Sequence, residues 1–143
     1  MAAAASVLVL QTAHAAPFAY ITNQGSHDVS VIDIATQAVV STVPVGRSPA
    51  GVVASSRGGR VYVSNPDSKT ISVIDMRQQA VVHTWPAGAG PVGLDVADDA
   101  SRLFVAYWYS NHLLVYELGA ADPAAQITRI PVGRAPAGVA ALP

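Results

Sequence analysis

Two arginines stand in turns of matching composition and are the residues of this sequence best suited to bind an anion. Arg47 follows a Val-Gly pair and precedes a proline by two residues, and Arg134 has the same surroundings. A planar guanidinium pairs with a carboxylate or a phosphate through two parallel hydrogen bonds. We therefore take Arg47 and Arg134 as candidate ligand-binding residues.

Four other side chains extend this candidate site. Asn23 and Asn65 end two closely similar segments, and Trp108 with Tyr109 directly follows the third. Aromatic rings provide flat surfaces for stacking, and the amide of asparagine both donates and accepts hydrogen bonds. Together with the arginines they predict a site for a small anionic ligand or a protein partner.

Two glycine-rich segments resemble motifs of cofactor-binding proteins and hydrolases but lack the necessary context. Residues 88–93 read G-x-G-x-x-G, the pattern that brings a backbone close to a pyrophosphate at the start of a helix. A proline interrupts this segment and no helical pattern follows it. Residues 46–51 have one residue too many for a G-x-S-x-G nucleophile elbow. We predict no cofactor here and no catalytic serine.

Histidine and aspartate positions do not predict a metal site or an acid–base pair. His27 and His112 fall in equivalent connections between strands, where we expect a solvent-exposed loop side chain rather than a metal ligand. Asp33 and Asp75 are 42 residues apart, and aspartate after a strand commonly accepts hydrogen bonds from turn N–H groups. We predict that both carboxylates bond to turn backbone, and we assign no catalytic residue.

The composition is that of a mostly packed chain with little charge. Of 143 residues, 51% are hydrophobic and 12% charged, and the net charge is −1. Without a basic stripe, nucleic acid is not a favoured partner. There is no cysteine, so the chain has no disulfide and no thiolate.

The first fifteen residues predict a secretory signal peptide. Ala2 to Leu10 is apolar except for Ser6, and residues 13–15 form an Ala-x-Ala site. The run is too short for a transmembrane helix. No basic residue follows Met1, so we expect the natural start to lie upstream; an alanine-rich first helix is the alternative. The expected location is the bacterial periplasm or the secreted fraction.

The rest of the chain consists of three copies of a repeat of about 42 residues. The copies are residues 18–60, 61–102 and 103–142, within a repeat region of residues 16–143. The third copy carries three extra residues near residues 119–126, where a surface turn accommodates an insertion. The matching segments are residues 19–23, 61–65 and 103–107; residues 29–33, 71–75 and 113–117; and residues 44–51, 86–93 and 131–138.

Each repeat contains four short segments rich in Val, Ile, Tyr and Thr, separated by turn-forming residues. In the first repeat we predict strands near residues 18–23, 29–34, 38–43 and 51–55. Four antiparallel strands per period of this length are typical of a β-propeller blade. The predicted fold is therefore all-β, a propeller of about three four-stranded blades. A β-sandwich would explain the strands but not the 42-residue self-similarity.

The segments Tyr-Ile-Thr-Asn at residues 20–23 and Tyr-Val-Ser-Asn at 62–65 resemble the YVTN family of β-propeller repeat proteins. Ser-Val-Ile-Asp and Val-Gly-Arg-x-Pro-x-Gly segments extend the resemblance over most of residues 18–142. The third repeat departs from the pattern, with Tyr107 at the Asn position and Glu117 at the Asp position. The resemblance implies an extracytoplasmic propeller, commonly of six or seven blades. Related propellers include lactonases and haem-binding domains of nitrite reductases, and such a fold alone does not fix an activity.

The family's strand order implies that the segment after Pro-x-Gly is the innermost strand of a blade. Blade one then lacks an inner strand, and residues 138–142 form a spare one. Three blades are fewer than an ordinary ring contains. Either the chain is a piece of a longer propeller, or copies assemble, for instance as two halves of a six-bladed ring. The order also places the loops at residues 23–28, 65–69 and 107–112 on one face with the turns of Arg47 and Arg134.

We expect an exported binding or interaction module without catalysis of its own. The alternative is a lactonase-like enzyme, or an accessory domain of a periplasmic quinone or haem oxidoreductase.

Overall fold

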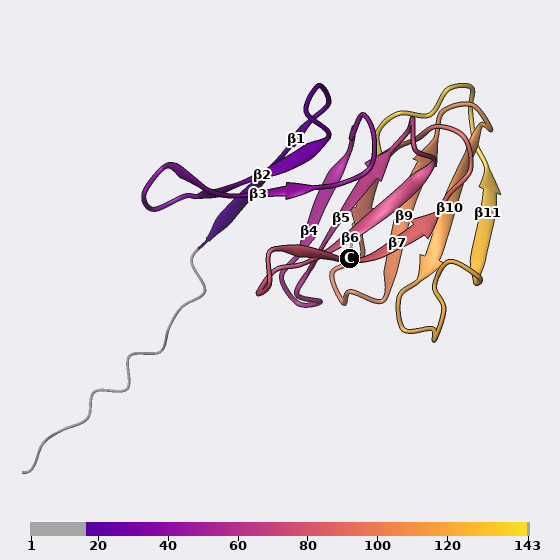
Figure 1. The fold of residues 1–143 in the computed structure, drawn as a ribbon. Helices are drawn as coiled ribbons and strands as arrows, with labels where there is room; N and C mark the ends of the chain where they lie inside the picture. Colours follow the sequence, from indigo (N-terminus) through magenta and orange to yellow (C-terminus); the bar gives the residue numbers. More distant parts are fainter. Residues whose placement is uncertain (1–16, 143) are drawn as a thin grey trace, which may run out of the picture.

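The computed structural model describes residues 17–142, so the predicted signal peptide at residues 1–15 lies outside the described part. Eleven strands make up all the regular structure of these residues, in three antiparallel sheets (Figure 1). No helix in this part of the chain is long and apolar enough to cross a membrane. The prediction of an all-β partial propeller is confirmed.

Blade one is a three-stranded sheet, and blades two and three have four strands each. Along the chain each sheet is ordered by sequence, and β4 and β8 are the first strands of blades two and three. β4 follows the Pro-x-Gly segment at residues 49–51 and β8 begins with the one at residues 91–93, which matches the expected inner-first order. Blade one contains β1 (Phe18–Asn23), β2 (Asp28–Asp33) and β3 (Ala38–Pro44); blade two β4 (Val52–Ser55), β5 (Arg60–Asn65), β6 (Thr70–Asp75) and β7 (Ala80–Pro86); blade three β8 (Pro91–Val96), β9 (Arg102–Tyr107), β10 (His112–Glu117) and β11 (Ile127–Pro131).

The aspartates that end β2 and β6 hold the turns to the outer strands, as the sequence predicted. The Oδ1 atom of Asp33 accepts the N–H groups of Ala35 and Thr36 at 2.8 and 3.1 Å. In blade two the Oδ1 atom of Asp75 accepts the equivalent pair of N–H groups at 2.8 and 3.0 Å. Such bonds give a partner to backbone N–H groups of the turn that are not paired in the sheet. Both carboxylates therefore shape turns.

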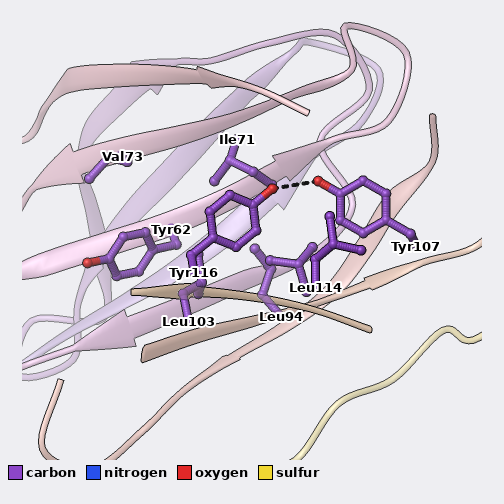
Figure 2. Packing of buried hydrophobic residues seen from close by; sticks show 9 residues of the cluster. Tyr62, Ile71, Val73, Leu94, Leu103, Tyr107, Leu114 and Tyr116 are labelled. Atoms are coloured by element: carbon purple, nitrogen blue, oxygen red, sulfur yellow. Dashed lines mark hydrogen bonds between the residues drawn. The ribbon is translucent and has the colours of Figure 1, made fainter. Parts of the chain in front are cut away.

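Two apolar layers join the three blades. One layer lies between blades one and two and contains Val29, Val31 and Val63. The other lies between blades two and three, and Figure 2 shows its three tyrosines with Ile71 and Leu103. Trp85 stacks on the ring of Tyr116 with centroids 5.9 Å apart and lies 6.0 Å from that of Tyr62. Blade two is thus covered on both faces.

The predicted strand at residues 138–142 is the main correction to the sequence-based account. These residues are irregular, because no strand of residues 17–142 lies beside them to form a ladder. The segment is still placed against blade three, since the Ala141 N–H donates to the Asp95 carboxylate at 2.7 Å. The three-residue insertion falls in the loop between β10 and β11, as expected.

Candidate functional site

Three equivalent turns lead from the outer strand of one blade to the next inner segment. Ser48, Gly90 and Ala135 occupy the same place in them, and all have a positive φ, of 54°, 77° and 52°. Non-glycine residues adopt this left-handed conformation infrequently, so its recurrence at Ser48 and Ala135 shows that the turn is conserved in shape between repeats. The preceding residues are Arg47, Ala89 and Arg134. The same turn therefore presents an arginine twice.

The first turn is held by hydrogen bonds to two hairpin loops. The Ser48 N–H donates to Nδ1 of His27 in the β1–β2 loop at 3.1 Å. The Arg47 N–H donates to Oγ of Ser68 in the β5–β6 loop at 2.5 Å, and the Ser48 hydroxyl donates to Asp67 at 2.6 Å. Backbone and side-chain contacts thus fix the position from which the Arg47 side chain extends.

The third turn is held in the same way by the β9–β10 loop. The Ala135 N–H donates to Oδ1 of Asn111 at 3.0 Å, and the Val132 N–H donates to the Asn111 carbonyl at 3.0 Å. Asn111 thus holds the third turn as His27 holds the first, by accepting a turn N–H group on its side chain. We call the face formed by these turns and the loops at residues 24–27, 66–69 and 108–111 the loop face.

Both arginine side chains of the loop face are exposed. Within residues 17–142 neither guanidinium makes a hydrogen bond or an ion pair. The Arg47 turn has the Asp67 carboxylate bonded to it, whereas the Arg134 turn is bonded to a neutral amide. Arg134 therefore has the more favourable surroundings for an anion.

Trp108 and Tyr109 lie against the second turn, where the repeat has no arginine. Their exposed fractions are 43% and 75%. The Trp108 N–H donates to the Gly90 carbonyl at 2.9 Å, and a Cβ atom at Gly90 would lie 2.6 Å from Cδ2 of Tyr109. Glycine adopts this φ without strain, and any side chain here would have to displace the Tyr109 ring. The two rings form an exposed aromatic surface on the loop that also holds the Arg134 turn.

The structure gives the two asparagines a bracing role within their hairpins. Asn65 is fully buried, and its Nδ2 donates to Thr70 and Ser72 at 3.1 and 2.9 Å. In blade one the Asn23 amide donates to the Asp28 carboxylate at 2.7 Å and to Ser30 at 2.8 Å. The recurrence of Asn with Ser seven residues later was a sequence signal for this brace. The solvent-facing candidates are therefore the two arginines and the two aromatic residues.

Blade three replaces the amide brace with a pair of phenols. Tyr107 stands at the asparagine position, and its hydroxyl shares a 2.7 Å hydrogen bond with that of Tyr116 (Figure 2). Burial raises the pKa of both hydroxyls above the ordinary value of tyrosine. The third repeat thus fills the asparagine position with a different buried and hydrogen-bonded side chain.

A hollow lies away from the loop face, between blades two and three. It has a volume of about 560 Å³ and is lined by Arg60, His83, Trp85 and Asp122 among others. Its arginine is engaged in an ion pair of 2.5 Å with Asp75. Sequence reasoning missed this hollow because its walls come from two blades and the insertion. In the described part of the chain, no three His, Asp or Glu side chains gather into a metal-binding group.

Solved structures support the propeller fold over most of the chain. Hydrazine synthase of Kuenenia stuttgartiensis is 28% identical, with a TM-score of 0.67, over 70% of this chain and 29% of that one. The dihydro-heme d1 dehydrogenase NirN is 21% identical, with a TM-score of 0.67, over 85% of this chain and 26% of its own. A candidate 6-phosphogluconolactonase of Bacteroides fragilis is 20% identical, with a TM-score of 0.68, over 85% of this chain and 37% of its own.

This chain accordingly spans between about a quarter and two fifths of the proteins that it resembles in structure. A search of curated proteins found no match. Residues 54–143, which contain blade three and all but the first two residues of blade two, match the YNCE-like β-propeller family. Since that match covers more than half of the sequence and agrees with the observed blades, the chain belongs to the YNCE-like β-propeller family.

Proposed function

We propose that this chain is a β-propeller binding module that recognises a small anionic ligand on its loop face. The observation that carries the proposal is the pair of exposed guanidiniums, Arg47 and Arg134, on hydrogen-bonded turns of the same shape. Because the turns are fixed, little backbone ordering opposes binding. Trp108 and Tyr109 supply a flat apolar surface beside the Arg134 turn.

The expected ligand carries at least one carboxylate or phosphate and an apolar or planar portion. Guanidinium binds these oxyanions through paired hydrogen bonds, and the exposed rings favour a stacked group. Exposed charges are screened by salt, so binding should weaken as the ionic strength rises. A protein partner with an acidic surface would use the same chemistry.

The test is calorimetric titration of the chain with benzoate and with phenyl phosphate, which combine an oxyanion with a planar ring. Replacing Arg47 and Arg134 together by alanine should weaken binding at least tenfold and leave the circular dichroism spectrum unchanged. The matched control replaces Arg57 and Arg129, which are equally charged, exposed and away from the loop face. Equal losses in both double variants would contradict a specific site.

We further propose that the module acts outside the cytoplasm, on the strength of the apolar run and Ala-x-Ala site at residues 2–15. Mass spectrometry of periplasmic material should find an N-terminus close to Ala16 when an upstream start is supplied. Recovery of chains with intact Met1 only from the cytosol would refute export.

A second candidate function is that of a propeller domain serving an enzyme. It is favoured by the 28% identity with part of hydrazine synthase and by the likeness to a dehydrogenase and a candidate lactonase. A screen with lactones decides one form of it. Turnover that Arg47→Ala abolishes would replace the binding proposal with an enzymatic one.

A further inference from the structure

We propose that residues 137–142 of one chain complete blade one of a second copy, so that two copies close a six-bladed ring. The inference rests on contacts that recur at each junction between blades and are missing at the two outer blades. It does not depend on the ligand proposed for the loop face.

The first recurring contact involves a hydroxyl on the second strand of a blade. In blade two, Ser64 Oγ accepts the N–H of Gly51 at 2.8 Å and donates to the carbonyl of Val92 in the next blade at 2.6 Å. In blade one the equivalent hydroxyl, Thr22, donates to the carbonyl of Ala50 at 3.1 Å. No N–H group of residues 17–142 donates to Thr22 Oγ1, since the inner segment that would carry it is the missing one. Blade one therefore presents half of this junction.

The second recurring contact involves the glycine of each Pro-x-Gly segment. A Cβ atom at Gly51 would lie 2.2 Å from the Val92 carbonyl oxygen, and one at Gly93 would lie 2.1 Å from that of Ala137. Residues 137–138 thus already occupy the place where the next blade's inner strand begins. At Gly138 a Cβ atom would meet nothing within 4 Å. The glycine is present, but the carbonyl that it should face is not.

A third contact, on the loop face, shows the same pattern. A Cβ atom at Gly46 would lie 2.7 Å from Asn65 of the next blade, and one at Gly88 would lie 3.3 Å from Tyr107. The equivalent Gly133 has nothing within 4 Å. The residue that takes the position of Asn65 and Tyr107 in blade one is Asn23. A copy of blade one would therefore supply the missing neighbour.

The outer faces of blades one and three are apolar in the way that a junction requires. Ile21 of β1 is 48% exposed, whereas the equivalent Val63 of blade two is fully buried against blade one. On blade three, Ile130 is 43% exposed, whereas the equivalent Trp85 packs in the aromatic layer. Exposed apolar sheet faces and unpaired strand edges favour association. Blade one of a second copy would cover the outer face of blade three.

The register of the shared blade follows from blade two. There Val52 pairs with Val63 and Ser55 pairs with Arg60. The equivalent pairs between copies are Val139 with Ile21 and Leu142 with Phe18. Residues 139–142 already lie over blade three, where they line one hollow with Phe104 and Leu113. The segment thus needs only to accept β1 of the second copy along its free edge.

This arrangement is closed and two-fold symmetric, because each copy gives one inner segment and receives one. Symmetric dimers are the commonest closed assemblies, and exchange of an element is a low-cost route to them. Six blades fall within the range of propeller rings. The ring would bring Arg47 and Arg134 of both copies around one channel mouth, so the partner contributes half of its guanidiniums.

Light scattering after size exclusion of the purified chain tests the inference. A mass of twice the 14.7 kDa of one chain is expected. Gly138→Ala and Gly133→Ala should each weaken the dimer at least tenfold, because the added methyl group would occupy the place of the second copy. Gly119→Ala is the matched control, since its Cβ atom is also unopposed but lies in the insertion, and it should leave the mass unchanged. A wild-type monomer, or any other assembly, overturns the six-bladed ring.

The register is tested by cysteines, which the natural sequence lacks. Under mild oxidation the double variant Ile21→Cys with Val139→Cys should give a dimer on denaturing gels that a reductant dissolves. The control pairs Val139→Cys with Ile34→Cys, a residue of similar exposure in the β2–β3 turn. No cross-linked dimer from the first variant, or equal amounts from both, would overturn the proposed pairing.

Discussion

Blades one and two are built from the same repeat but differ sharply in burial. In β5 and β6 every residue after the first is buried, whereas β1 has no buried residue and β2 has two. Their sequences do not explain this, since Phe18–Asn23 and Arg60–Asn65 differ mainly by conservative exchanges. Blade two has a neighbouring blade on each face and its own inner strand. Within residues 17–142, blade one has a single neighbouring blade and no inner strand. Burial in this fold is therefore set by the adjacent blades.

The largest expected effect comes from filling a junction that the chain makes within itself. Gly93→Ala would place a methyl group in the space of the Ala137 carbonyl and should lower the free energy of unfolding by about 3 kcal/mol. Urea unfolding measures it, with Gly119→Ala as the control. An unchanged midpoint would mean that blades two and three do not meet closely, and the comparison of junctions would fail.

The phenol pair of blade three gives the next largest effect. Tyr107→Phe leaves the buried hydroxyl of Tyr116 without its partner and should cost about 1–3 kcal/mol of folding free energy. Replacing both tyrosines by phenylalanine should recover part of that loss, since no polar group is then orphaned. The same urea experiment measures both variants. A double variant less stable than the single one would assign the loss to packing.

Two equivalent hydroxyls sharpen the contrast between complete and incomplete blades. Ser64→Ala removes two hydrogen bonds and should cost about 1–2 kcal/mol, while Thr22→Ala removes one and should cost less. The difference between these two costs should become smaller at protein concentrations where the dimer forms. In the dimer, Thr22 Oγ1 also accepts an N–H group, as Ser64 Oγ does in blade two. Unfolding at several protein concentrations measures this, and equal costs in the dilute monomer would contradict it.

The sequence was sufficient for the fold because the turns recur at fixed spacing. Strand positions in the first repeat and the turn-holding role of Asp33 and Asp75 could be predicted from the repeated segments, and the inner-first order from the resemblance to YVTN propellers. The placement of the turns on one face with the hairpin loops followed from that order. The full burial of Asn65 could not be predicted, because it depends on the close approach of Gly46, which precedes blade two in the chain. Residues 138–142 were expected as a strand, but a strand exists only beside a partner.

The smallest expected effect concerns acid. Hydrogen bonds from the Gln78 and Arg77 N–H groups and the charge of Arg60 lower the pKa of Asp75. Since the folded-state pKa is lowered, the carboxylate favours folding above about pH 4, and this contribution is lost as the pH falls further. Asp75→Asn should therefore flatten the fall in thermal midpoint between about pH 5 and pH 2. If the thermal midpoint of Asp75→Asn falls with pH as steeply as that of the unmodified chain, Asp75 does not contribute to the loss of stability in acid.

Amide hydrogen exchange at Thr22 tests most directly the claim that blade one receives its inner strand from a second copy. In blade two the equivalent N–H, that of Ser64, donates to the inner-strand carbonyl of Gly51 at 3.0 Å. We predict that the Thr22 amide is protected like that of Ser64 at concentrations where the dimer forms, and loses protection on dilution or in Gly138→Ala. A Thr22 amide that exchanges freely at every concentration, while Ser64 stays protected, would contradict the account.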